Sequence, residues 1–175
     1  MKGYKLAIGI DKVKGPFPVI VVLDIPEDAT VVVPVQKVAL DNHPTITKIR
    51  KLRSDRATVV DMYPLDKECT DWNWNRLAFS AYELNYMEVY CDLQRINTIY
   101  KIGKDIVSDI TMDEKESCGT GIHYFESEED MMLYYDYDLS HWFREILEYL
   151  ELDWYSQGYS VYARDIMIKL SEVKG

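Results

Sequence analysis

The stretch from Cys118 to Asp130 constrains the fold most, because it carries turn, strand and helix signals one after another. Gly119 and Gly121 permit the backbone angles of a tight turn that other residues avoid. Residues 122–125 suit the pleated surface of a strand. Ser127 is followed by three acidic residues, which is typical of a helix N-cap with a negatively charged first turn. We therefore expect a turn, a strand and the start of a helix here.

Strand signals are frequent in the first half of the chain. The run from Val19 to Ile25 consists almost entirely of Val, Ile and Leu, which indicates a buried strand. Other segments with strand character are Tyr4–Ile10, Ala29–Val35, Ala57–Met62, Thr98–Ile102 and Ile106–Ile110. Gly103 and Lys104 form a turn signal between the last two segments, so we expect these to pair as a short hairpin.

Helix signals lie in the middle and at the end of the chain. Residues 66–97 are rich in aromatic residues near helical spacing, so we expect a helical insert there. Residues 136–175 predict a helical extension, although residues 159–173 fit a strand as well as a helix, and we prefer the strand. The sequence thus predicts an α+β fold in a single domain, residues 1–175. Its mixed or antiparallel sheet would carry one central helix and one or two amphipathic helices near the C-terminus.

The composition indicates a folded, soluble protein. Apolar residues make up 47% of the chain, and no uncharged run approaches the roughly 18 residues that cross a membrane. Three widely spaced cysteines make a poor disulfide framework and fit a reducing compartment. The N-terminus lacks the apolar region of a secretory signal, which favours the cytoplasm. Without a C-x2-C pair to anchor a metal site, we expect no metal and no cofactor.

The charge of the chain is strongly asymmetric. Residues 1–64 hold ten Lys and Arg against seven Asp and Glu, whereas residues 65–175 hold ten against twenty-three. The most acidic block runs from Asp113 to Asp153, with thirteen acidic and two basic residues. Such a field repels nucleic acid and membrane phosphates and attracts basic surfaces.

Four segments together resemble a known family. They are Val22–Ala29, Lys51–Val60, Tyr100–Lys104 and the motif Cys118-Gly119-Thr120-Gly121-Ile122-His123-Tyr124-Phe125, of the form C-x-x-G-I-H-[FY]-F. The segments lie within residues 20–135, and the last motif is the most specific. The chain resembles a family of uncharacterised domains from large DNA viruses and phages, which often precede pentapeptide repeats.

The resemblance implies a fold and a viral or phage origin, and with it the host-cell cytoplasm. It implies no reaction, because the family has no assigned activity. The chain departs from the family pattern at two positions, where Leu52 replaces a cysteine and Tyr124 replaces a phenylalanine. The resemblance therefore carries over no role that needs that cysteine.

An enzymatic alternative starts from His123, which lies in the glycine-flanked motif. With Tyr124 and Arg53 as further catalytic candidates, it would be a nucleotide-handling enzyme, for example of the ADP-ribosyl-transfer type. A structural histidine that ties the glycine turn to a backbone carbonyl explains the same residues. No hydrolase, phosphate-binding or metalloprotease motif accompanies them. We therefore favour a non-catalytic role.

A basic patch offers a second alternative, which is binding to nucleic acid. Its members are Lys48, Arg50, Lys51, Arg53 and Arg56. In an extended segment these cations could meet a phosphate track. The acidic remainder of the chain argues against this, and the patch could equally contact the acidic block within the same chain or in a homodimer.

A protein-binding role uses the acidic, aromatic C-terminal region. The candidate binding residues are Tyr134, Tyr135, Tyr137, Asp138, Trp142, Glu145, Tyr149 and Trp154. Large aromatic side chains are favoured at interfaces, and acidic ones select a basic partner. The sequence therefore predicts a small acidic protein of viral type that binds a host or viral protein with a basic surface.

Overall fold

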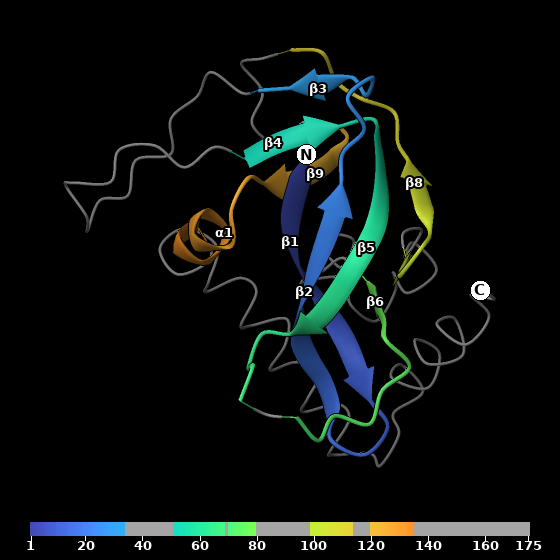
Figure 1. Ribbon diagram of the computed structural model, residues 1–175, viewed down its shortest axis with the longest axis vertical. Coiled ribbons are helices and arrows are strands. Elements are labelled where there is room, and N and C mark those ends of the chain that lie inside the picture. Colours follow the sequence, from blue (N-terminus) through green and yellow to red (C-terminus); the bar gives the residue numbers. More distant parts are fainter. Residues whose placement is uncertain (34–50, 69, 80–98, 114–119, 135–175) are drawn as a thin grey trace, which may run out of the picture. The chain divides into compact units, whose positions relative to one another are not determined.

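A computed structural model describes residues 1–33, 51–68, 70–79, 99–113 and 120–134 (Figure 1). Within these ranges lie nine strands and one short helix. In chain order they are β1 (Lys2–Asp11), β2 (Gly15–Asp24), β3 (Val31–Val32), β4 (Lys51–Ser54), β5 (Arg56–Pro64), β6 (Leu77–Phe79), β7 (Ile99–Lys101), β8 (Asp105–Val107), β9 (Ile122–Phe125) and α1 (Glu128–Tyr134).

Hydrogen-bonded neighbours follow the order β3-β4-β9-β1-β2-β5-β8, and β6 pairs with both β1 and β7. The described residues divide into two compact units. The first comprises residues 1–5, 22–33, 51–61, 105–113 and 120–134, and the second comprises residues 6–21, 62–68, 70–79 and 99–104. Strands β1, β2 and β5 contribute residues to both units. The expectation of a single domain stays a prediction.

In the first unit, β4 is the antiparallel neighbour of both β3 and β9 (Figure 1). Arg53 lies opposite His123 in the register, and Tyr4 of β1 lies opposite Phe125 on the other side of β9. The core of this unit contains Leu23, Ile25, Leu52, Val59, Ile122, Tyr124, Phe125 and Met131. The predicted strand at residues 122–125 is confirmed.

The start of α1 was predicted from Ser127 and is confirmed. The Ser127 hydroxyl accepts a hydrogen bond from the Asp130 backbone N–H at 3.1 Å, which satisfies one free donor of the first turn. Glu128, Glu129 and Asp130 place negative charge at the positive end of the helix dipole.

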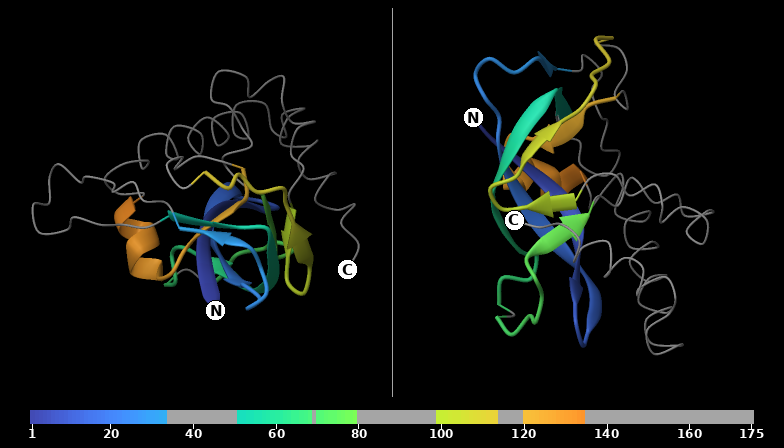
Figure 2. Two further views of the ribbon diagram at one scale, coloured as in Figure 1. Left: turned by 90° about the horizontal axis from the view of Figure 1, so that it is seen from above. Right: turned by 90° about the vertical axis from the view of Figure 1, so that its right-hand side faces the viewer.

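In the second unit, β1 and β2 form a hairpin through the turn at residues 12–14 (Figure 2). The predicted strands at residues 4–10 and 19–25 are confirmed by β1 and β2, whose side chains from Leu6 to Ile10 and from Val19 to Leu23 are buried. β6 pairs with β1 through Ile8 and Phe79.

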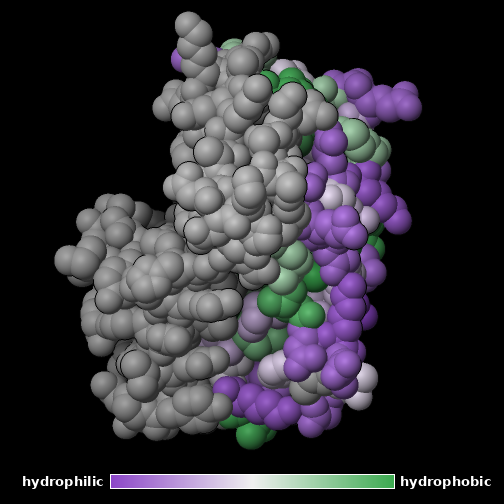
Figure 3. All heavy atoms as spheres, turned by 90° about the vertical axis from the view of Figure 1, so that its left-hand side faces the viewer, coloured by the Kyte–Doolittle hydropathy of each residue, from purple (hydrophilic) through white to green (hydrophobic). Residues whose placement is uncertain are grey.

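The face drawn in Figure 3 presents mostly hydrophilic described residues with a smaller hydrophobic area among them.

The expected α+β fold class is wrong, because the described residues form a mostly antiparallel β structure whose α-helix, α1, has seven residues. The expected helical insert fails at its start, where residues 70–75 have no regular structure and 77–79 form β6. Trp72 and Trp74 are two residues apart, which matches an extended chain rather than a helical face. The rest of the insert (80–97) and the extension at 136–175 lie outside the described residues.

The expected hairpin between residues 98–102 and 106–110 is also wrong in its pairing. β7 pairs with β6, and β8 pairs with β5. The turn at Gly103 forms as expected, with positive φ at the glycine and a hydrogen bond from the Lys104 N–H to the Lys101 carbonyl. Longer-range partners therefore replace the local one that the sequence suggested.

Candidate functional site

The segment before β6 brings two tryptophans onto one phenylalanine. Phe17 of β2 stacks on Trp72 with ring centroids 4.1 Å apart and planes 7° from parallel. Trp74 meets the same phenylalanine edge-on at 5.0 Å. Phe17 is buried while both tryptophans are half-buried, so the two indoles keep part of their surface at the protein exterior. Aromatic pairs of this kind stabilise their arrangement by about 0.5–1.5 kcal/mol beyond area burial.

Asp11 fixes this segment to the β1–β2 turn. One carboxylate oxygen accepts hydrogen bonds from the backbone N–H groups of Val13 at 2.8 Å and Lys14 at 2.7 Å. The other oxygen accepts from the Asn73 backbone N–H at 2.6 Å. The Lys12 N–H donates to the Asn73 carbonyl at 2.8 Å. The residue between Trp72 and Trp74 is therefore held on both sides of its backbone.

Asp11 is ionised in this setting. Burial alone would raise the pKa of its carboxyl group, but the backbone hydrogen bonds from Lys14, Val13 and Asn73, with the charge of the Lys14 ammonium, outweigh burial. The net effect lowers the pKa of Asp11 below its ordinary value of 3.8. The buried Asp11 carboxylate is therefore negatively charged at neutral pH.

Gly9 leaves room for the aromatic cluster. A Cβ atom at this position would lie 2.8 Å from Val19 Cγ2 and 3.1 Å from both the Phe17 and the Trp74 rings. The first distance is shorter than real Cβ contacts allow, so a larger residue at position 9 would force Val19 or the β1 backbone to shift, and the two rings would have to yield slightly.

The tryptophans line an open groove of about 580 Å³. Its lining combines aromatic, basic and polar side chains: Met62, Tyr63, Pro64, Asp66, Lys67, Thr70, Trp72, Trp74 and Arg76. All belong to the end of β5 and the segment that follows it. The volume lies within the roughly 300–1,000 Å³ range of ligand sites. Three of the nine lining residues are aromatic, two are apolar and four are polar or charged.

Basic side chains lie beside the aromatic rings. The Lys14 ammonium is 5.0 Å from the Trp72 ring centroid and 3.1 Å from the Asp71 carboxylate. The Lys67 ammonium is 5.3 Å from the Tyr63 ring centroid. Arg76, at a positive φ of 56°, donates from its guanidinium to the Met62 carbonyl at 2.6 Å. The groove lining therefore combines three aromatic rings with two cations, Lys67 and Arg76, and one carboxylate, Asp66.

The enzymatic candidates lie in the first unit. Arg53 is fully buried, and its guanidinium donates to the Thr111 carbonyl at 2.8 Å and to the Asp113 carbonyl at 3.0 Å. His123 is half-buried opposite Arg53, and its backbone carbonyl accepts from the Lys5 ammonium at 2.9 Å. The described contacts of this arginine are thus contacts to backbone, which fix residues 111–113 onto β4.

Tyr124 has the environment of a core residue. Its side chain is fully buried, and burial, with the nearby Glu126 charge, raises the pKa of its phenol to about 12. Its ring packs on Gly3, where a Cβ atom would lie 2.6 Å away. Among the described residues, its hydroxyl has no hydrogen-bond partner. A phenol with this pKa stays protonated at neutral pH.

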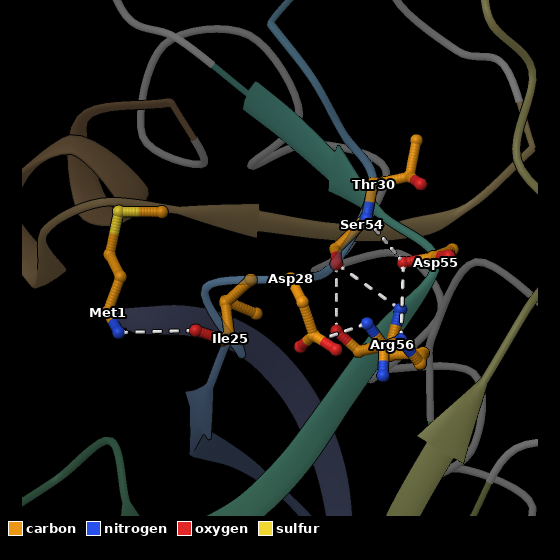
Figure 4. A network of polar contacts seen from close by, with 7 residues as sticks. All are labelled: Met1, Ile25, Asp28, Thr30, Ser54, Asp55 and Arg56. Atoms are coloured by element: carbon orange, nitrogen blue, oxygen red, sulfur yellow. Dashed lines mark hydrogen bonds and ion pairs between the residues drawn. The ribbon is translucent and has the colours of Figure 1, made fainter.

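The described residues of the predicted basic patch do not form a continuous exposed cationic surface. Lys51 and Arg53 are buried. Arg56 forms ion pairs with Asp28 at 3.1 Å and Asp55 at 3.8 Å, within the polar network of Figure 4. Lys48 and Arg50 lie outside the described residues.

The predicted protein-binding residues lie almost entirely beyond the described ranges. Tyr134 is the last residue of α1. Outside those ranges are Tyr135, Tyr137, Asp138, Trp142, Glu145, Tyr149 and Trp154. In the part of the chain that the structure describes, no three His, Cys, Asp or Glu side chains gather into a metal site.

Sequence reasoning missed the groove, although two signals could have indicated it. Trp72 and Trp74 have the two-residue spacing of an extended chain. Asp11 precedes a Lys-Val-Lys-Gly turn, and an aspartate in this position can accept hydrogen bonds from the backbone N–H groups of the turn. The fold and site together define an antiparallel β protein with an aromatic groove. Comparisons with protein-family models, curated proteins and solved structures find no match for this chain. Over the described ranges, none of the helical structure is long and apolar enough to cross a membrane.

Proposed function

We propose that this chain is a small, non-catalytic protein-binding protein that holds its partner at the aromatic groove. The observation that carries the proposal is the open groove of about 580 Å³ lined by Tyr63, Trp72 and Trp74. Tyr and Trp are enriched among the residues that contribute most to binding energy at protein interfaces. Phe17 and Asp11 hold the tryptophan segment in place, which reduces the ordering cost of binding.

Charge favours a protein over a nucleic acid as the partner. The chain carries a formal net charge of −10, which opposes the approach of phosphate backbones. A nucleotide-handling enzyme centred on His123 receives no support from the described contacts, because Arg53 and Tyr124 are buried and bonded or packed within the β structure.

The acidic, aromatic C-terminal region remains part of the proposal as a second contact. The thirteen acidic residues between Asp113 and Asp153 support a partner that presents a basic surface. The three widely spaced cysteines support a reducing compartment, so we place the partner in the cytoplasm. The resemblance to viral and phage domains supports a host cell as its location, and homodimer formation stays a prediction.

A differential pull-down tests the proposal. The wild-type chain, Trp74→Ala and Tyr63→Ala are immobilised separately, and proteins retained from lysate at physiological salt are compared by mass spectrometry. Both variants remove a groove-lining ring, so we expect proteins retained by the wild type to be lost from both. A third variant with Asp136, Asp138 and Glu145 changed to lysine tests the C-terminal contact in the same way.

Val107→Ala is the matched control, because Val107 is 76% exposed on β8 and does not line the groove. It removes exposed apolar surface without touching the proposed site. The proposal is wrong if the folded Trp74→Ala and Tyr63→Ala variants, checked by circular dichroism, retain the same proteins as the wild type and Val107→Ala.

A further inference from the structure

We infer that the open edge of β8 binds an extended, basic segment of a partner protein, which adds a strand to the sheet. The inference goes beyond the proposed function, because β8 and the aromatic groove have no residue in common. It follows from the backbone groups that β8 turns outward, from the exposure of its side chains and from two aspartates along the same edge.

β8 lies at one end of the strand order, with β5 as its neighbour (Figure 1). On the other side of β8, the described residues provide no strand. A strand in this position presents backbone N–H and C=O groups with which another extended chain can pair. Peptide recognition by strand addition uses such main-chain hydrogen bonds for affinity and side chains for specificity. The edge of β8 therefore has the geometry of a strand-addition site.

The register shows which backbone groups of β8 point outward. The Ser108 N–H donates to the Asp55 carbonyl at 2.9 Å, and the same ladder sets Ile106 opposite Ala57. In an antiparallel ladder, pairs that exchange hydrogen bonds alternate with pairs that do not. Ile106 therefore bonds to β5, as Ser108 does, and the backbone groups of the first and last residues of β8 point to the open edge. Among the described residues these outward groups have no hydrogen-bond partner.

The side chains along this edge alternate between the interior and the surface. Ile106 is buried and Ser108 is half-buried, whereas Asp105, Val107 and Asp109 are exposed. Side chains two residues apart in an extended chain project to the same face, so the two aspartates lie on one face with Val107 between them. An added antiparallel strand has the same period. Two of its side chains, four residues apart, therefore face Asp105 and Asp109.

Both aspartates bring negative charge to the edge. One carboxylate oxygen of Asp105 accepts a hydrogen bond from the Thr58 hydroxyl at 2.6 Å, and a hydroxyl does not neutralise the carboxylate. Among the described residues, neither Asp105 nor Asp109 forms an ion pair. The two carboxylates are therefore available to basic side chains of an added strand.

The cations next to this edge have other partners. Arg56, in the neighbouring strand β5, pairs with Asp28 at 3.1 Å and with Asp55 at 3.8 Å. The Lys104 ammonium donates to the Ile99 carbonyl at 3.2 Å. The edge is thus acidic, in agreement with the formal net charge of −10 for the whole chain. Opposite charges across neighbouring strands are stabilising and like charges are destabilising, so the edge favours a basic strand over a second copy of itself.

Short peptides test strand addition directly. The probe is capped Lys-Thr-Thr-Thr-Lys, whose lysines face Asp105 and Asp109 when its central threonine lies opposite Val107. The comparison peptide has glutamate in place of both lysines. Binding to the full chain is measured by nuclear magnetic resonance, from the shifts of the Asp105 and Val107 amide signals with peptide concentration. We expect the lysine peptide to bind saturably and the glutamate peptide not to bind.

Backbone methylation of the peptide separates strand addition from attraction between charges alone. Opposite Val107, the N–H of the central threonine points toward β8, whereas the N–H of each flanking threonine points away. Methylation of the central nitrogen should weaken the lysine peptide at least about tenfold, because it removes a hydrogen bond and places a methyl group against the edge. Methylation of one flanking nitrogen is the matched control and should change the affinity less than about threefold.

A pair of variants at one position tests the backbone of β8. Val107→Pro removes an outward N–H but no hydrogen bond to β5, and proline is tolerated at such edge positions. It should weaken the lysine peptide at least about tenfold, while the amide signals of Ile106 and Ser108 show that β8 is still paired. Val107→Ala retains the N–H and should bind within about twofold of the wild type.

A second pair of variants tests the charge. Asp105→Asn combined with Asp109→Asn should weaken the lysine peptide about threefold to tenfold, because two exposed ion pairs are lost. Asp24→Asn combined with Asp66→Asn makes the same change in net charge away from β8 and should leave the affinity unchanged. Equal weakening by both double variants would show that only the net charge of the chain attracts the peptide.

The remaining outcomes are also decisive. The inference is wrong if the lysine peptide shows no saturable binding, or if the two methylated peptides bind equally. Equal binding of the lysine and glutamate peptides contradicts a basic occupant. Self-association of the chain that Val107→Pro abolishes would assign the edge to a second copy instead. The pull-down on the groove variants is a separate measurement: if it does not depend on Tyr63 and Trp74 while the lysine peptide binds, the groove function fails and the strand-addition site remains.

Discussion

Asp11 should be the residue on which the aromatic groove most depends, and Asp11→Asn tests this. Its carboxylate accepts three backbone hydrogen bonds, at 2.8, 2.7 and 2.6 Å, and hydrogen bonds to charged groups contribute about 1.5–3 kcal/mol each. An asparagine keeps one oxygen, which can still accept from the turn N–H groups of Val13 and Lys14. Its amide N–H2 group would face the Asn73 N–H, so two donors would meet and no hydrogen bond could form. One charge-assisted bond is thus lost and two are weakened.

We expect Asp11→Asn to lower the free energy of unfolding by about 2–4 kcal/mol. For a chain of this length, a loss of about 1 kcal/mol in unfolding free energy lowers the melting temperature by roughly 2–4 °C. The melting temperature of Asp11→Asn should therefore fall by roughly 4–16 °C. Circular dichroism measures the melting, and amide exchange of Val13, Lys14 and Asn73 reports the local loss. Asp24→Asn is the control, because the Asp24 side chain is 55% exposed and pairs only loosely with the N-terminal amine at 3.6 Å.

The same variant has a pH signature. The folded-state pKa of Asp11 is lowered, so its contribution to stability is fully present above the unfolded value of 3.8 and is lost as the pH falls through the folded value. The difference in unfolding free energy between wild type and Asp11→Asn should therefore shrink below about pH 3.8. Equal melting temperatures for Asp11→Asn and Asp24→Asn at neutral pH would show that the Asp11 carboxylate does not stabilise this segment.

Three further predictions concern packing and capping, and a fourth concerns the ionisation of Tyr124. Gly9→Ala should destabilise the chain by about 1–3 kcal/mol, measured by urea unfolding, because its Cβ would lie 2.8 Å from Val19 Cγ2; an unchanged midpoint would contradict the close packing. Ser127→Ala should cost about 1 kcal/mol by removing the cap of α1, whereas Ser127→Asp should retain most of it. Tyr124→Phe should be neutral or stabilising, because the buried hydroxyl has no partner among the described residues, and a loss above about 1 kcal/mol would reveal one. In the wild type, ultraviolet titration should place Tyr124 ionisation near pH 12, with stability fully present below pH 10 and falling as the pH rises from 10 toward 12.

The local features of the fold could be predicted from the sequence. The Val19–Ile25 run became the buried strand β2, and Ser127 became the cap of α1, because each depends on residues close in the chain. Partner choice could not be predicted in this way. β7 and β8 follow each other after a turn, yet they pair with β6 and β5, since burial of Ile99 and Ile106 against distant strands decides the pairing.

The candidate site was harder to predict for the same reason. Trp72 and Trp74 could be counted in a helical pattern, but contact with Phe17 and the bond from Asn73 to Asp11 hold them in an extended segment. Phe17 and Asp11 lie more than fifty residues earlier in the chain, so no local window joins them. Arg53 was expected at the surface because it lies in a run of basic residues. It is instead buried, and its guanidinium donates to backbone carbonyl groups.

Site-specific photo-crosslinking tests whether the groove binds a protein partner. A photoreactive phenylalanine analogue at Thr70, an exposed position that lines the groove, is compared with one at Thr30, an exposed position in the first unit. We expect a discrete protein adduct from position 70 in lysate, which excess unlabelled wild type competes away and excess Trp74→Ala does not. Adducts that are the same from both positions, or that Trp74→Ala competes away as well as the wild type does, would contradict a protein-binding groove.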